Sequence, residues 1–166
     1  MKRIGLVTCL EIPEPDPDEG IQLQSVRDAG AEVELIAWDD PTTDLASFDV
    51  IVLRSCWDYP WRENEFRDWL QIADRETRVV NPVEVVSWDL HKGYLLDLQQ
   101  AGVPVVPTRL LEAGCHEEGL CKILDEQAWD QYVIKPAISA GSWLTALFGS
   151  NDLPAARQFV LQHGQD

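Results

Sequence analysis

Lysine is scarce in this chain, and one of its four lysines stands where an anion could be bound. Lys135 follows the apolar run YVI and precedes the small-residue turn PAISAGS. A turn of Gly, Ala and Ser lets a ligand approach the backbone closely, and a lysine beside it supplies a positive charge. Ala140, Gly141 and Ser142 would add backbone N–H and hydroxyl donors. The alternative is a plain surface hairpin, because short glycine motifs often match by chance.

Lys92 is a second lysine at an informative position. It follows SWDLH, in the first turn of a predicted helix. By its residue type alone it is more often an exposed helix lysine than a ligand contact. The adjacent His91 could take part in acid/base chemistry, although a single histidine at a helix start is more often structural.

A third group of candidate residues follows the apolar run DVIVL. In open parallel sheets, ligands bind at the carboxyl ends of the strands, and this run delivers RSCWDY to that edge. The two-pronged guanidinium of Arg54 suits a carboxylate or phosphate. In the alternative, the aromatic residues pack a loop and Arg54 pairs with a nearby carboxylate. The candidate substrate-binding residues are Arg54, Ser55, Trp57, Asp58 and Tyr59.

The elements that must position these residues alternate between strand and helix. Strands are predicted over residues 3–9, 32–38, 49–53 and 78–81, and helices over 16–29, from 63 onward, and over 87–101. Asp16 at the N-cap with Glu19 three residues later fits a capping box. A further helix near 122–128, a hairpin of Tyr132 onward with 143–148, and a helix over 152–162 complete the chain.

The pattern predicts an α/β protein of two parts. Residues 1–107 read as a three-layer, Rossmann-like domain with a mainly parallel sheet, because its strands are apolar and alternate with helices. Residues 108–166 read as a small α+β lobe of helix, hairpin and helix.

Charge narrows the classes of partner. The formal net charge is −16, with 29 acidic and 13 basic residues. That balance argues against a broad nucleic-acid or anionic-membrane surface, since both need clustered lysine and arginine. The first apolar run is short and is broken by Glu11 and Pro13, so we expect neither a signal peptide nor a membrane span. We therefore expect the protein to be cytoplasmic.

The four cysteines have no framework spacing, and we expect them to be reduced. Cys115, His116 and Cys121 could be imagined as metal ligands. No second pair is present to close a tetrahedral site, so metal is disfavoured there.

Two segments together resemble a known superfamily. NPVEVVSWDLHKGYLLDLQQAGVPVVPT, followed about thirty residues later by YVIKPAISAGSWLT, is similar to the paired lysine motifs of ATP-grasp proteins. AWDDP and VLRSCWDYPWRENEFRDWL resemble the branch that contains the cycloserine-forming ligase and glutathione-synthetase-like proteins. The resemblance covers nearly the whole chain.

The resemblance implies roles for the candidate residues. Lys92 and Lys135 would contact ATP phosphates, Ala140 to Ser142 would close over the β and γ phosphates, and the RSCWDY segment would line the substrate side. The superfamily's reaction activates a carboxylate with ATP to an acyl phosphate, which an amine then attacks, while lysines and magnesium offset the charge on the phosphoryl group.

The chain also departs from the superfamily's pattern. The adenine-binding hinge and the magnesium ligands lie in a further stretch beyond QFVLQHGQD, so we expect these residues by themselves to be the N-terminal, inactive portion of a carboxylate–amine ligase for an amino-acid-like substrate. The alternatives are a non-enzymatic small-ligand-binding or assembly module, and an unrelated parallel α/β protein. Self-association through the face that a missing lobe would cover is a further expectation.

Overall fold

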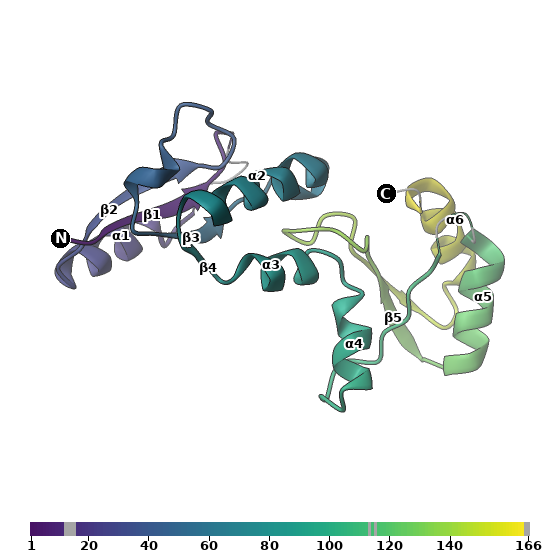
Figure 1. The fold of residues 1–166 in the computed structure, drawn as a ribbon. Coiled ribbons are helices and arrows are strands. Elements are labelled where there is room, and N and C mark those ends of the chain that lie inside the picture. The colour runs from purple at the N-terminus through teal and green to yellow at the C-terminus, as the bar shows by residue number, and fades with distance from the viewer. Residues whose placement is uncertain (12–15, 113, 115, 165–166) are drawn as a thin grey trace. The chain divides into compact units, whose positions relative to one another are not determined.

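The computed structural model describes residues 1–11, 16–112, 114 and 116–164, which form two compact units, Met1–Trp88 and Asp89–Asp166 (Figure 1). The division follows Trp88, whereas the predicted domain boundary follows residue 107. The assignment of residues 1–107 and 108–166 as domains stays a prediction. Among the described helices, none is both long and apolar enough to cross a membrane.

A parallel sheet forms the centre of the first unit. Its strands are β1 (Arg3–Thr8), β2 (Glu32–Ala37), β3 (Val50–Ser55) and β4 (Val79–Val80), in the order β2-β1-β3-β4. All three strand pairs are parallel, which confirms the predicted α/β class. Thr8 is in register with both Ala37 and Ser55, so the carboxyl ends of three strands meet at one edge.

Helix α2 (Glu63–Glu76) buries the face that the i, i+3, i+4, i+7 spacing predicts. Phe66, Leu70 and Ala73 are buried, and Phe66 is surrounded by rings. Its ring centroid lies 5.2 Å from that of Trp38 and 5.7 Å from those of Tyr59 and Trp69. These contacts join α2 to the carboxyl edge of the sheet.

Helix α1 (Glu19–Asp28) begins later than the capping box predicts. Asp18 is at its N-cap, and no side chain caps it. Asp16 is not the cap, because its carboxylate accepts hydrogen bonds from the Asp18 N–H and from the Ser55 hydroxyl. The capping assignment was therefore wrong, and a contact with β3 took its place.

The single helix predicted over residues 87–101 is also wrong. The structure has two helices, α3 (Val83–Asp89) and α4 (Tyr94–Gln100), with a break between them. Within the break, the backbone N–H of Lys92 donates to the Ala137 carbonyl at 2.8 Å instead of to a helix carbonyl. Helix α4 closes where Gly102 takes a φ of +79°, a conformation that favours glycine.

The second unit contains α4, α5 (His116–Gln127), α6 (Leu153–His163) and an antiparallel pair, β5 (Gln131–Ile134) and β6 (Ala146–Gly149). Leu120, Tyr132, Ala156 and Val160 form its buried core. Helix α5 is longer than predicted, and β6 begins later than the predicted Trp143. Ser142 and Leu144 have positive φ, so the loop continues to Thr145.

Phe66→Ala tests the aromatic contact between α2 and the sheet edge. Phe66 is 2% exposed, so its truncation should lower the free energy of unfolding by about 3–5 kcal/mol through lost burial and a cavity. Urea titration followed by circular dichroism measures this. Ile72→Ala on the same helix is the control: its side chain is 50% exposed, and we expect a change within about 1 kcal/mol. Equal losses in the two variants would contradict the assignment.

Candidate functional site

The loop after β5 is shaped by backbone conformation. Lys135 is the first residue after the strand, and it is exposed. Gly141 and Ser142 have φ values of 58° and 59°, and the Trp143 N–H donates to the Ala140 carbonyl at 3.0 Å. A Cβ at Gly141 would meet no atom within 4 Å, so its φ rather than lack of space favours glycine there. We call residues 135–145 the small-residue loop.

Lys92 is held against the small-residue loop, although the two are far apart in the sequence. Its Nζ donates to the Ser139 hydroxyl at 2.8 Å and to the Ser139 carbonyl at 3.1 Å. Its backbone N–H is bonded to Ala137, as described above. The half-buried Lys92 thus lies within the second unit beside the loop that begins with Lys135.

The electrostatics of this loop favour an anion. Burial, and then the positive charge of Lys135, hold the pKa of Lys92 below its usual value. Burial and a like charge both disfavour the ammonium form of a lysine. An anion between the two lysines would offset both effects, and a phosphate could also accept from the loop's N–H groups.

In the first unit, Arg54 and Ser55 contact Asp16. The Ser55 hydroxyl donates to the Asp16 carboxylate at 2.8 Å, and the Arg54 guanidinium lies 3.5 Å from it. Arg54 Nε also donates to Gln22 at 2.7 Å. The Ser55 hydroxyl, followed by the Asp18 N–H, lowers the pKa of Asp16. Arg54 therefore pairs with a nearby carboxylate, which is the second of the two alternatives that the sequence left open.

The remaining candidates at this edge have mixed surroundings. Trp57 is half-buried, and the ring of Tyr59 packs on Phe66. Asp58 accepts a hydrogen bond from the Trp38 indole at 2.8 Å and faces a pocket. The structure brings Asp58, but not Arg54 or Ser55, to the lining of that pocket.

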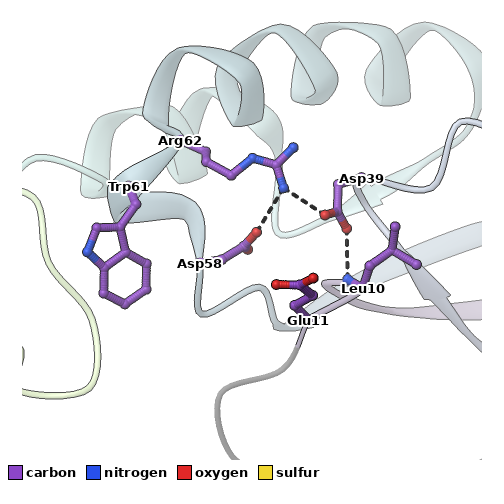
Figure 2. Close-up of a pocket in the computed structure, with 6 residues that line it drawn as sticks. All are labelled: Leu10, Glu11, Asp39, Asp58, Trp61 and Arg62. Atoms are coloured by element: carbon purple, nitrogen blue, oxygen red, sulfur yellow. Dashed lines mark hydrogen bonds and ion pairs between the residues drawn. The ribbon is translucent and has the colours of Figure 1, made fainter.

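Arg62 and Asp39 are residues that the sequence reasoning missed. Arg62 Nη1 lies 2.7 Å from Asp39 and 3.2 Å from Asp58, and its Nη2 lies 2.7 Å from Glu65 (Figure 2). The guanidinium also sits over the Trp38 ring, 4.4 Å from its centroid. Glu65 and then Asp39 raise the pKa of Arg62. Asp39 could have been identified from the sequence, because it closely follows the predicted strand that is β2 in the structure, and the carboxyl ends of parallel strands share one edge of the sheet.

The pocket at this edge has a volume of about 500 Å³. Figure 2 shows the carboxylates of Glu11, Asp39 and Asp58 gathered around it, together with Arg62. Three carboxylates and one guanidinium suit a small polar ligand that carries an amino group. The lining residues are Leu10, Glu11, Asp39, Asp58, Trp61 and Arg62.

Neither unit shows a metal centre in the part of the chain that the structure describes, where no three His, Cys, Asp or Glu side chains are grouped to hold an ion. The hypothetical trio of Cys115, His116 and Cys121 falls partly outside it. Cys115 and the side chain of His116 are not among the described groups.

Apolar surface is exposed on the hairpin of the second unit. Val133 and Leu147 lie directly opposite each other on β5 and β6, and they are 53% and 66% exposed. Such a pair is the kind of surface through which the predicted self-association would act, and that association stays a prediction.

Comparisons with known proteins point to one group of enzymes. Residues 4–81 match the family described as D-cycloserine synthetase DcsG, N-terminal domain. The cycloserine biosynthesis protein DcsG of Streptomyces lavendulae is 34% identical over 137 residues, which are 80% of this chain and 45% of that protein.

Two solved structures resemble the chain. The crystal structure of D-cycloserine synthetase DcsG matches with a TM-score of 0.86 and 28% identity, over 96% of this chain and 55% of that one. The RimK domain ATP-grasp protein from Sphaerobacter thermophilus matches with a TM-score of 0.68 and 19% identity, over 98% and 59%. This second match is a likeness of fold. The chain spans about half the length of the relatives it matches.

Arg62→Ala tests whether one guanidinium holds the sheet edge together. Its removal leaves the Asp39 and Asp58 carboxylates, both largely buried, without their cation, so the free energy of unfolding should fall by about 1–3 kcal/mol. Urea titration is the measurement. Arg75→Ala in α2, the helix that Arg62 immediately precedes, is the matched control, because Arg75 is exposed and donates to the Gln71 carbonyl. A loss no larger than that of Arg75→Ala would contradict this role.

Proposed function

Residues 4–81 belong to the D-cycloserine synthetase DcsG N-terminal domain family, and we propose that this chain binds ATP phosphates as the N-terminal portion of an ATP-dependent carboxylate–amine ligase. The ligase relationship rests on the comparisons. The nucleotide role rests on the small-residue loop and the two lysines beside it.

One observation carries the proposal: two of only four lysines come to the same loop in a chain of net charge −16. Lys92 is half-buried there, and the charge of Lys135 acts on it. Placing like charges together is unfavourable unless an anion offsets them. A nucleoside triphosphate supplies several adjacent negative charges of the kind that would fit.

The donor set suits the phosphates. The Lys92 Nζ and Lys135 would hold phosphate oxygens as point charges, and the backbone N–H groups of Ala140 and Gly141 with the Ser142 hydroxyl would close around them. The bonds of Lys92 to Ser139 fix its position before a ligand arrives. ATP, when bound, supplies the phosphoryl group that activates a carboxylate.

Magnesium fits less well. Among the residues that the structure describes, no three His, Cys, Asp or Glu side chains are placed to hold a metal ion together, so we assign no residue of this chain to the metal. We propose binding, rather than turnover, for these 166 residues by themselves.

For the substrate, we propose an amino-acid-like molecule at the carboxyl edge of the parallel sheet. Asp58 and Arg62 present a carboxylate and a guanidinium to the pocket there. Arg54, Ser55, Trp57 and Tyr59 would support this edge, and the Arg54 and Ser55 side chains are already engaged by Asp16. A small-ligand-binding module without ligase activity would use the same pocket.

Lys135→Ala tests the phosphate role directly. Loss of one exposed phosphate contact should weaken ATP binding about tenfold, equivalent to about 1.4 kcal/mol, in calorimetric titration. Lys122→Ala is the matched control. Lys122 is an exposed lysine on α5 in the same unit, so its substitution removes the same charge away from the small-residue loop. Equal weakening by both substitutions, or no ATP binding by folded wild type, would contradict the proposal.

The lowered pKa of Lys92 gives a second test. A phosphate beside Lys92 favours its ammonium form and so raises the pKa that burial and Lys135 hold down. At alkaline pH, where free Lys92 is partly neutral, ATP binding should take up protons, and affinity should fall as pH rises further.

Calorimetry in two buffers of different ionisation enthalpy measures this uptake. Lys92→Arg keeps the charge, because arginine stays protonated, and should abolish the uptake while retaining binding. Identical proton uptake by wild type and Lys92→Arg would show that Lys92 is not the titrating group.

A further inference from the structure

A polar cluster lies beside the core of the second unit, apart from the small-residue loop. Cys121 comes from α5 and Arg157 from α6, and Arg157 Nη2 donates to the Cys121 sulfur at 2.9 Å. Cys121 is half-buried, whereas Cys9 and Cys56 are buried. Reactive cysteines typically lie in electropositive, partly exposed surroundings, and the contact with Arg157 is of that kind.

Two further donors of this cluster lack acceptors. The Tyr132 hydroxyl and Arg157 Nε are buried, and neither has a hydrogen-bond partner among the described residues. Tyr132 itself is 7% exposed. Leaving a buried donor unsatisfied costs about 1–3 kcal/mol, so an acceptor at this place would be stabilising.

The three side chains occupy one region of the unit. Leu120 and Ala156, which precede Cys121 and Arg157 in the chain, pack with Tyr132 in the buried core. Burial raises the pKa of Tyr132, and the negative charges of Asp152 and Cys121 raise it further. The Tyr132 hydroxyl therefore stays protonated at neutral pH and can donate a hydrogen bond.

We propose that Cys121 is a site of oxidation to sulfenic acid by peroxides, with the new oxygen accepting hydrogen bonds from Arg157 and Tyr132. The thiolate sulfur attacks one peroxide oxygen; an S–O bond forms and the O–O bond breaks. The sulfur loses two electrons, and the peroxide, which gains them, releases hydroxide that leaves as water after protonation. This inference goes beyond the proposed function and does not depend on nucleotide binding.

The buried cysteines of the first unit provide a contrast within the same chain. Cys9 and Cys56 donate to backbone carbonyls at the end of β1 and β3. Burial is the main cause that raises the pKa of both thiols. Buried thiols of this kind are poor nucleophiles, so peroxide should select Cys121 over them.

The test uses the full chain with Cys115→Ser, because Cys115 and Cys121 share the tryptic peptide 110–122 and could otherwise form a disulfide. Hydrogen peroxide is added with dimedone as the sulfenic-acid trap, and peptide mass spectrometry follows each cysteine. We expect Cys121 to be labelled well before Cys9 and Cys56. Arg157→Met should slow its labelling about five- to tenfold, as expected for loss of a contacting cation at a half-buried residue.

Arg109→Met is the matched control. Arg109 is exposed in the same unit and donates to the Thr108 carbonyl, so its removal should leave the rate unchanged. Tyr132→Phe keeps the ring and removes the hydroxyl, and it should leave the first oxidation rate unchanged but shorten the lifetime of the sulfenic acid before over-oxidation.

A second measurement needs no substitution at Cys121, Arg157 or Tyr132, so it remains valid if those variants fail to fold. In the Cys115→Ser chain, Cys121 should be labelled faster when the chain is folded than when it is unfolded in urea, where Arg157 no longer contacts the sulfur. Labelling of Cys121 no faster than of Cys9 and Cys56, or no faster when folded than in urea, overturns the proposal. So does a folded Arg157→Met chain that reacts at the rate of Arg109→Met.

Discussion

Acidic residues outnumber basic residues by 16 in this chain, so carboxylates repel one another unless a cation lies between them. The positions of the few lysines and arginines therefore decide where carboxylates can lie close together and where an anionic ligand could bind. Arg62 satisfies carboxylates from the end of β2, the segment after β3 and the first turn of α2. Lys92 and Lys135 instead meet at one loop, where the described contacts of Lys92 are to neutral oxygens. In the first arrangement the carboxylates of the protein offset the positive charge, whereas in the second two positive charges share one loop, which is the observation behind the proposed phosphate role.

The break between α3 and α4 gives the lysine arrangement its rigidity. A continuous helix would have committed the Lys92 N–H to a helix carbonyl, whereas the break lets it bond to Ala137 while the ammonium bonds to Ser139. A backbone bond and a side-chain bond from one residue fix both the direction and the depth of that side chain. Such placement would favour the proposed phosphate binding, because a lysine that is already in place loses less conformational freedom when it binds.

At the carboxyl edge of the sheet, the charged side chains bond mainly to one another. Asp16 was expected to cap α1 but bonds Ser55 and lies near Arg54, so the loop before α1 is tied to β3. Asp58, Asp39 and Arg62 are left to shape the pocket, with Trp38 beneath the guanidinium. In the second unit, Arg157 contacts a sulfur, so the half-buried Cys121 has a cation beside it, whereas the buried thiols of the first unit donate to backbone carbonyls.

The sequence by itself determined the parallel α/β class, the buried face of α2 and the hairpin after Tyr132, while the shared phosphate role of Lys92 and Lys135, which the resemblance implies, stays a prediction. These follow from periodicity, from local turn chemistry and from motif order, which neighbouring residues carry. Tertiary structure alone decided the break at Lys92, the recruitment of Asp16 by Ser55, the Asp39 contact with Arg62 and the Arg157 contact with Cys121. The partners in these contacts are distant in the chain, so the pairing depends on which strand ends and helix faces the fold brings within hydrogen-bonding distance.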